Sequence, residues 1–591
     1  RRSADEAEAL LVAARAAFYA DDPTLSDRLA SRSATLFRNQ GREVWALRAD
    51  SVSVEAAYLK EGASTELLGR AQELASDLEA AGLVYASASA AVLVGRMSID
   101  LGHIEAARSA LQRLTAVRTG PVELRIQKWL AVAMLRMADG DRQGADSAAR
   151  AGLNLLDAYQ SGLGATDLRA GIERLGDQMG TIGLNLAVAS GRPRRVLQWM
   201  ERTRGRALRY PPVVPDGDDP ESDLLAELRR VTAELRKPDN VDDHQLIRRQ
   251  RLLQEEIRAV NRIRTSSDTS TREMRVSDLL ETLGGRTLIE LGAVGDDLFA
   301  VVVRDSRFRL VELASGFDAA TALSRLRFDL RRAARLNRDP GDVRAGVADF
   351  SKVVFAPLSG LSDDVVLIPP GPLMAAPWGV MPDLADATVT IAPSAETWWR
   401  SETLDGTGAG VVLASGPDLE NAEAEVASLR ALYRKARIFG PTDPGRTVGE
   451  AFRGTAIAHV ACHASFEASN PMFSALRLGD GDFNVYDLER IGRPPDVMVL
   501  SACDSGYTDI RPGAELTGLT SALLGLGTKS VIASIGLVPD SRATANLMLE
   551  FHRGLIDGLV PSRALDAAQR QAMAEPDGYI AASSFVCVGG C

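Results

Sequence analysis

The stretch AIAHVACH at residues 456–463 decides the fold, together with VMVLSACD at residues 497–504. Each is an apolar run of strand length that ends at a reactive side chain, His463 in the first and Cys503 in the second. Such runs are typical of strands that are buried on both faces of a mainly parallel sheet. Catalytic and ligand-binding residues of these sheets lie at the carboxyl ends of the strands. If the two strands are neighbours, we therefore expect both side chains at one sheet edge.

Further apolar runs alternate with helical segments on both sides of these two strands, which predicts an α/β domain with a mainly parallel, doubly covered sheet. The other predicted strands lie at residues 364–371, 388–394, 410–416, 435–441 and 530–536, and the predicted helices at 319–337, 420–436, 514–527 and 542–558. Residues 287–313 instead predict a β-meander, because short β-rich runs are separated there by Gly-Asp and Asp-Ser turns.

The first third of the chain repeats a pattern of two helices joined by a turn. The turn glycines are Gly62, Gly102, Gly140 and Gly191, and a further turn is predicted near Asp22. A period of roughly 40 residues is typical of helical hairpins stacked into an all-α solenoid, similar to tetratricopeptide repeats. Such a region offers a concave surface to a partner. The alternative is a scaffold that only positions the rest of the chain.

These patterns predict a multidomain chain, as 591 residues exceed what one hydrophobic core supports. The predicted parts are helical repeats at 1–210, a linker and helical hairpin at 211–273, a β-meander with a helix at 274–349, and the α/β domain at 350–591. The hairpin has an Arg-rich face in which glutamates are interleaved. This mixture favours a solvated helix face over a nucleic-acid surface.

Composition narrows the class of protein. A net charge of -11 argues against a protein that mainly binds nucleic-acid phosphates or acidic membranes. The apolar runs are shorter than the roughly 20 residues of a spanning helix, and the first residues do not resemble a secretory signal. The four cysteines form no CxxC pair, so they predict neither a disulfide framework nor a structural zinc site. We expect a cytoplasmic protein without a cofactor.

The pair His463 and Cys503 has the chemistry of a nucleophile and its base. A thiolate is intrinsically nucleophilic, and a neighbouring imidazole both raises the thiolate fraction and protonates the leaving amine. The alternative is that both are ordinary core residues at strand ends. We interpret His459 as a core residue because it lies deeper in the run, and Cys462 as another because it faces away from His463.

The C-terminal part resembles the CHAT family of caspase-like peptidase domains, which are related to separase and the caspases. The motifs that carry the resemblance are VLIPPGPLMAAPWGVM (366–381), HVACHASFEASNPMFSALRLGDG (459–481), VLSACDSG (499–506), GAELTGLTSALLGLGTKSVIASIGLVPDSRAT (513–544), EFHRGL (550–555), AQRQAM (568–573) and SSFVCVGG (583–590). They occur in the order and at the spacing of the family over roughly residues 350–591. Residues 274–349 would then belong to a pseudo-caspase-like half, and helical repeats are the usual companion of this domain.

The resemblance implies that His463 is the catalytic histidine and Cys503 the nucleophile of a cysteine endopeptidase. Backbone N–H groups of Cys503 and Ala464 would hold the oxyanion. The chain departs from the family at Ala464, where Gly is frequent, and at Gly536, where many relatives have Trp. The second change should alter a wall of the substrate cleft.

Asp540 and Asp504 are the candidates for a specificity pocket that binds Arg or Lys before the cleaved bond. Asp540 occupies the place of an acidic residue that does this in separase-like relatives, and a carboxylate pairs well with such a cation. The alternative is that both Asp residues cap helices.

For the whole protein the resemblance implies a protease that a partner protein or ligand activates through the helical repeats. It also implies a role in bacterial defence, with a gasdermin-like or other defence protein as substrate, and with nucleic acid involved only indirectly. Two alternatives stay open. One is a catalytically silent adaptor, and the other is a hydrolase or acyltransferase that acts on a small substrate through the same dyad.

Overall fold

The structure of the chain is a computed structural model. The structure describes residues 2–19, 22–112, 114, 120–163, 174–204, 220–237, 240, 243–262, 274–336, 340–358, 361, 364–465, 467, 471–502, 509–511, 515–517, 519–575 and 577–590. The chain forms two compact units. The first comprises residues 1–160 and 171–189, and the second residues 161–170 and 190–591. No helix in the described ranges has the length and apolar character needed to cross a membrane.

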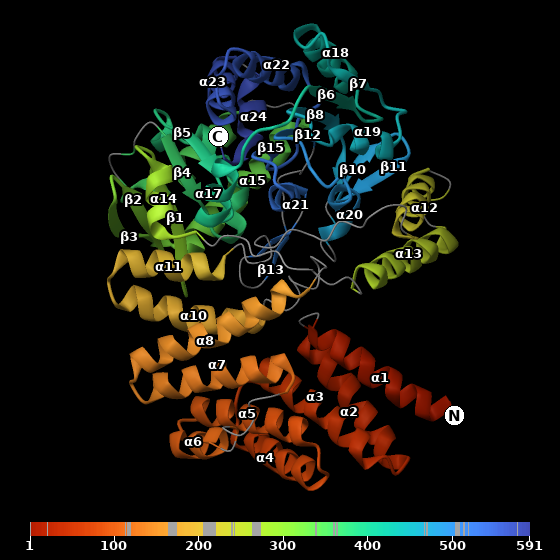
Figure 1. Ribbon diagram of the computed structural model, residues 1–591, viewed down its shortest axis with the longest axis vertical. Coiled ribbons are helices and arrows are strands. Elements are labelled where there is room, and N and C mark those ends of the chain that lie inside the picture. The colour runs from red at the N-terminus through yellow and green to blue at the C-terminus, as the bar shows by residue number, and fades with distance from the viewer. Residues whose placement is uncertain are drawn as a thin grey trace. The chain divides into compact units, whose positions relative to one another are not determined.

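The first unit is a row of antiparallel helices, each packed on its neighbours along the chain (Figure 1). The helices are α1 (Arg2–Tyr19), α2 (Pro23–Asn39), α3 (Glu43–Glu61), α4 (Thr65–Ala80), α5 (Val84–Asp100), α6 (Ile104–Gln112), α7 (Val122–Ala138), α8 (Arg142–Ser161) and α10 (Arg174–Ala189). The packing of α4 against α5 buries a continuous cluster of side chains that includes Leu74, Leu78 and Met97. The predicted helical hairpins are therefore confirmed.

The turns between these helices contain residues that suit helix ends, namely glycines with positive φ and an Asp that caps a helix. Gly62 directly follows α3 with a φ of 79°, and Gly140 follows α7 with a φ of 77°. This left-handed conformation carries no steric penalty for glycine. The predicted turn near Asp22 is also present, because the Asp22 carboxylate accepts a hydrogen bond from the Leu25 N–H at 2.8 Å and so caps α2.

The second unit is built on a mixed sheet that has eleven strands in the described part of the chain, in the order β3-β2-β1-β4-β5-β16-β15-β12-β8-β6-β7. Strands β1, β4, β5 and β16 are parallel to one another. Strands β15, β12, β8, β6 and β7 are also parallel, but they run in the opposite direction. The two parallel halves meet where β16 pairs antiparallel with β15. The mainly parallel sheet is confirmed, but this reversal in its middle was not predicted.

Apolar runs of the sequence form these strands. Their bounds are β1 (Thr287–Val294), β2 (Asp297–Arg304), β3 (Arg307–Ser315), β4 (Asp364–Ile368), β5 (Thr388–Ile391), β6 (Val411–Ser415), β7 (Arg437–Phe439), β8 (Ile457–Cys462), β12 (Val497–Ala502), β15 (Ser530–Ser534) and β16 (Phe585–Gly589). The predicted meander is β1 to β3, and its second turn has positive φ at Asp305 and Ser306. A smaller sheet joins β9 (Ala464–Ser465), β10 (Ala475–Leu478) and β11 (Gly481–Asn484).

Helices cover both faces of the sheet. The first face, next to β12, β15 and β16, packs on α22 (Arg542–Ile556) and α23 (Pro561–Ala574), and α18 (Ala422–Leu432) packs on β6 beside them. The opposite face packs on α15 (Gly316–Leu336), α16 (Gly341–Phe355), α19 (Gly445–Phe452), α20 (Val485–Glu489) and α21 (Leu519–Leu526). Other helices of the unit are α14 (Val276–Leu283), α17 (Ala395–Thr403) and α24 (Gly578–Ser583).

The predicted helix at 514–527 is shorter than expected. Its first residues form β14 (Glu515–Thr517), which pairs antiparallel with β13 (Asp509–Arg511), and the helix α21 begins only at Leu519. The pairing partner lies just before the predicted helix and outside its apolar pattern, so helical periodicity did not reveal the pairing.

The predicted hairpin consists of α12 (Pro220–Leu235) and α13 (His244–Arg262). Its arginines do not all lie on a solvated face, because Arg229 is 4% exposed and forms ion pairs with Asp480 at 3.2 Å and Asp487 at 2.5 Å. The solvated-face prediction is therefore wrong for Arg229. The glutamates interleaved in the sequence were a poor guide, since its partners come from the segment that follows β10.

The helix α11 (Pro193–Thr203) belongs to the second unit and brings a buried charge cluster to the meander. Glu201 accepts hydrogen bonds from the N–H groups of Ala395 and Glu396 at 2.7 Å. Arg204 pairs with Glu290 on β1 at 3.1 Å, and the side chains are 8% and 0% exposed. Burial raises the pKa of Glu201 and raises that of Glu290 well above its usual value, with the neighbouring Glu201 adding to the second effect.

Candidate active site

The site is built at the carboxyl ends of β8 and β12. These strands are adjacent and parallel, and the last residue of β12, Ala502, is the register partner of Cys462, the last residue of β8. His463 is the next residue after β8, as Cys503 is the next residue after β12 in the sequence. Cys503 and Asp504 lie outside the described residues. The expectation that the two strands are neighbours is confirmed.

His463 is half-buried and is oriented by a backbone carbonyl. Its Nε2 lies 3.2 Å from the carbonyl oxygen of Asp418, in the segment between β6 and α18. A carbonyl oxygen only accepts hydrogen bonds, so this contact requires the proton on Nε2. The other nitrogen of the neutral ring, Nδ1, is then free of a proton and is the basic atom.

Asp418 is a residue that the sequence interpretation missed. It has a φ of 63°, which is uncommon for a residue other than glycine but is tolerated by Asp. Its carboxylate pairs with Arg477 at 2.5 Å, and the Arg477 N–H donates to the His463 carbonyl at 2.8 Å. Arg477, a residue of β10, therefore bonds to both Asp418 and His463. The Gly-Pro-Asp turn directly after β6 was the available signal in the sequence.

Ala464 begins the strand β9, where it is the register partner of Leu476 on β10. The backbone N–H of Arg477 donates to the His463 carbonyl, so the next pair along the ladder, His463 and Arg477, is a hydrogen-bonded pair. In an antiparallel ladder bonded and non-bonded pairs alternate. The N–H of Ala464 therefore does not point at β10, and Ala in place of Gly retains a backbone donor beside His463.

Gly536 lies shortly after β15 and is half-buried. A Cβ atom added there would meet no atom within 4 Å. Space for a side chain is thus present at this position.

Asp540 is exposed and holds the turn that precedes α18. Its two carboxylate oxygens accept the N–H groups of Glu420 at 2.9 Å and Asn421 at 3.1 Å, and its carbonyl accepts from the Asn421 side chain. Asn421 is the residue that caps α18. Asp540 is thus not a helix cap itself, because Ser541 caps the helix that follows it, α22.

A small cavity adjoins these residues on the side of the sheet that α18 and α22 cover. It is lined by Leu419, Ala422, Glu425, Ala461, Cys462, Ser501, Val538, Pro539, Asp540, Ser541 and Thr544. The lining thus includes residues at the ends of β8 and β12 together with two carboxylates.

His459 and Cys462 are buried, as predicted. His459 also takes part in a hydrogen-bonded chain that was not predicted. Its Nε2 lies 2.7 Å from Oε1 of Glu425, and its Nδ1 lies 3.0 Å from Nε2 of His552. The Tyr433 hydroxyl lies 3.1 Å from Nδ1 of His552.

Burial sets the protonation of the far end of this chain. It lowers the pKa of His552 well below its usual value, and the neighbouring His459 lowers it further, so His552 is neutral. Burial also raises the pKa of Tyr433 to about 12, so its hydroxyl keeps its proton.

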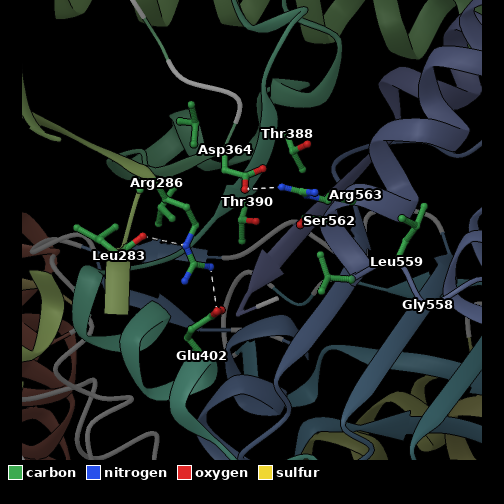
Figure 2. Close-up of a pocket in the computed structure, with 14 residues that line it drawn as sticks. Leu283, Arg286, Asp364, Thr388, Thr390, Glu402, Gly558, Leu559, Ser562 and Arg563 are labelled. Atoms are coloured by element: carbon green, nitrogen blue, oxygen red, sulfur yellow. Dashed lines mark hydrogen bonds and ion pairs between the residues drawn. The ribbon is translucent and has the colours of Figure 1, made fainter. Parts of the chain in front are cut away.

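A larger cavity of about 580 Å³ opens at the amino ends of β4 and β5. Because β16 is parallel to β5 and antiparallel to β15, this is the same sheet edge at which β12 and β8 end. Figure 2 shows Arg286 directed at Glu402 and Arg563 directed at Asp364, each pair 2.9 Å apart. The four charges neutralise one another in pairs, so this cavity contributes little net charge to the edge.

Among the described residues, no group of three His, Cys, Asp or Glu side chains is arranged to hold a metal ion.

Known proteins resemble the chain over ranges of different length. No curated protein matches the chain. Two structures of the Saccharomyces cerevisiae separase–securin complex are similar, with TM-scores of 0.43 and 0.40 and sequence identities of 9% and 10%. In both cases the match covers 95% of this chain and 61% of the matched chain in the complex. This chain therefore spans less than two thirds of the length of that matched chain. Residues 348–589 match the family model of the CHAT domain.

Proposed function

We propose that the chain is a cysteine endopeptidase in which His463 and Cys503 form the catalytic dyad. The CHAT match supports membership of a caspase-like protease family. The observation that carries the proposal is the register of β8 and β12, which places the residues preceding His463 and Cys503 side by side. The contact between His463 and the Asp418 carbonyl adds to it, because it leaves the ring with one basic nitrogen.

The mechanism follows from that tautomer. Nδ1 of His463 accepts the proton of the Cys503 thiol, and the thiolate attacks the carbonyl carbon of the scissile peptide. The tetrahedral intermediate collapses when the imidazolium gives its proton to the leaving amine, which departs and leaves a thioester. A water molecule, deprotonated by His463, then hydrolyses the thioester and restores the thiol. The positive charge of the imidazolium is stabilised by the Asp418 carbonyl dipole.

The backbone N–H groups of Ala464 and Cys503 are the proposed oxyanion donors. The support for Ala464 is that its N–H is not used in the ladder with β10. Donors of this kind are worth about 3 to 4 kcal/mol each in comparable enzymes.

A preference for Arg or Lys before the cleaved bond is part of the proposal, with Asp540 and Asp504 as candidate partners of the cation. Asp540 lines the small cavity next to the end of β8. Digestion of a peptide library by the active protein should enrich basic residues at the cleaved position. Absence of that enrichment would end the specificity proposal and leave the dyad untouched.

Activation by a protein or ligand at the helical repeats is a further proposal, since an unregulated cytoplasmic protease would be harmful. A defence role with a gasdermin-like or other protein substrate is proposed from the family resemblance alone. Full activity of the isolated chain on its natural substrate would contradict the gating.

The decisive experiment incubates the wild type and Cys503→Ala with the protein products of neighbouring genes. New fragments that require Cys503 support the endopeptidase. A biological effect that survives Cys503→Ala would instead identify a silent adaptor. Labelling of Cys503 by small esters but by no peptidyl electrophile would identify a small-molecule hydrolase or acyltransferase.

A further inference from the structure

The small cavity beside the ends of β8 and β12 contains two carboxylates that differ in what they already bind. Both oxygens of Asp540 accept backbone N–H groups, and the residue is exposed. Glu425 is 4% exposed, and within the described part of the chain only its Oε1 has a hydrogen-bond partner. Glu425 is therefore the carboxylate with the greater remaining capacity to accept hydrogen bonds.

The buried contacts behind Glu425 form one continuous chain. If Glu425 accepts from Nε2–H of His459, then Nδ1 of His459 accepts from Nε2–H of His552, and Nδ1 of His552 accepts from the Tyr433 hydroxyl, which also lies 3.4 Å from the His552 carbonyl oxygen. Every imidazole nitrogen is used once, and each ring needs only one proton. The neutral state that burial imposes on His552 agrees with this pattern. In this direction the chain ends at the Glu425 carboxylate, which accepts from the imidazole N–H of His459.

A purely structural role explains only part of this arrangement. The chain links α18 and α22 to β8, but apolar side chains of similar size would pack these elements at least as well, because burying a charge is costly. What a buried carboxylate adds is a fixed, oriented negative charge at the wall of a cavity. The cavity is small, so it suits the end of a side chain rather than a whole ligand.

We propose that Glu425 is a specificity-determining residue, whose carboxylate binds the ammonium or guanidinium group of a substrate Lys or Arg while His459, His552 and Tyr433 hold it in place. The inference rests on the proposed endopeptidase function and assigns its basic subsite to a residue in the core of the unit. Asp540 then acts mainly by fixing the turn in front of α18.

The test uses the full chain and two peptidyl acyloxymethyl ketones that differ only in the residue before the reactive group, Arg in one and norleucine in the other. Glu425→Gln keeps the size of the side chain and an acceptor for His459. We expect it to lower the rate constant for labelling of Cys503 by the Arg probe about 10- to 150-fold, the range for a hydrogen bond to a charged group. The norleucine probe should change less than about two-fold. The matched control is Glu423→Gln, an exposed glutamate on the same helix, which should alter neither rate.

Equal loss with both probes would overturn the inference in favour of a structural role, and unchanged rates would show that Glu425 does not contact the cation. The labelling is also run with the protein products of neighbouring genes as candidate activators, and a wild-type chain whose Cys503 reacts with neither probe there would reject the peptidase and this inference with it.

A second measurement separates the subsite from catalysis. The chain has only five histidines, so their ring signals can be followed by NMR. Agmatine, a free guanidinium compound, should shift the His459 signal in the wild type and not in Glu425→Gln. No shift in the wild type would overturn the assignment of the cation to Glu425 even if Cys503 proves catalytic.

Discussion

The backbone conformation of Asp418 offers a sharp test of how His463 is oriented. The residue presents its carbonyl to Nε2 of His463 while its φ is 63°. The left-handed region costs an ordinary residue about 1–2 kcal/mol, costs a β-branched residue at least this much, and costs glycine nothing. Asp418→Val should therefore shift the segment away from the conformation that holds His463, whereas Asp418→Gly should retain it.

The comparison isolates the backbone, because both variants lose the ion pair with Arg477. That pair is largely exposed and is worth about 1 kcal/mol at most. A penalty of about 1–2 kcal/mol reduces the population of the oriented state by about 5- to 30-fold, since about 1.4 kcal/mol is a factor of ten.

The assay is the rate of Cys503 alkylation by iodoacetamide as a function of pH. An oriented imidazole should keep the thiolate fraction high near neutral pH, where a free thiol with a pKa of about 8.5 is mostly protonated. Asp418→Val should therefore alkylate about 5- to 30-fold more slowly than Asp418→Gly at pH 7, and the two should converge above pH 9. Equal rates at pH 7 would refute the orienting role of the carbonyl.

Three other substitutions test the surroundings of the site. Arg204→Met leaves the Glu290 carboxyl without its cation and should cost about 3–5 kcal/mol in urea denaturation at pH 7.5. Because the folded-state pKa of Glu290 is raised, its protonated form adds stability that is lost as pH rises, so this cost should shrink at pH 5.5. Gly416→Ala would place a Cβ atom 2.5 Å from Cβ of Cys462, and overpacking of about 1–3 kcal/mol should lower the melting temperature. Tyr433→Phe removes the half-buried hydroxyl beside Nδ1 of His552 and should destabilise the second unit by about 1–3 kcal/mol in the same urea assay.

Controls distinguish these effects from general damage. Arg553→Ala removes an exposed ion pair with Glu550 on α22 and should cost less than about 1 kcal/mol. An Arg204→Met penalty that is the same at both pH values would contradict the role of the buried glutamates. An unchanged melting temperature for Gly416→Ala would mean that the β6 end can move away from β8.

Local patterns in the sequence predicted the elements of the fold well. The apolar runs that end at His463 and Cys503 mark adjacent parallel strands, and glycines such as Gly62 mark the turns between helices. In these cases the structure depends on the periodicity of apolar residues and on the backbone conformations that individual residues such as glycine prefer.

The features that could not be predicted depend on partners remote in the sequence. Glu425 has the pattern of a surface residue on an amphipathic helix, and only its contact with His459 on β8 explains its burial. Arg229 is buried by acidic residues about 250 positions away. The orienting group of His463 is a backbone carbonyl, which has no sequence signature beyond the turn that contains it.

The position of β16 has a consequence for how the protein is made. This strand is the last along the described chain, yet it lies between β5 and β15 and joins the two oppositely directed halves of the sheet. A growing chain on the ribosome therefore contains the segments that flank the site before it contains the strand that unites them. Until Phe585–Gly589 emerges, β5 and β15 each present an unpaired edge. Assembly of the continuous sheet thus has to wait until β16 has been translated after all ten other strands of this sheet, which delays the appearance of a complete active edge.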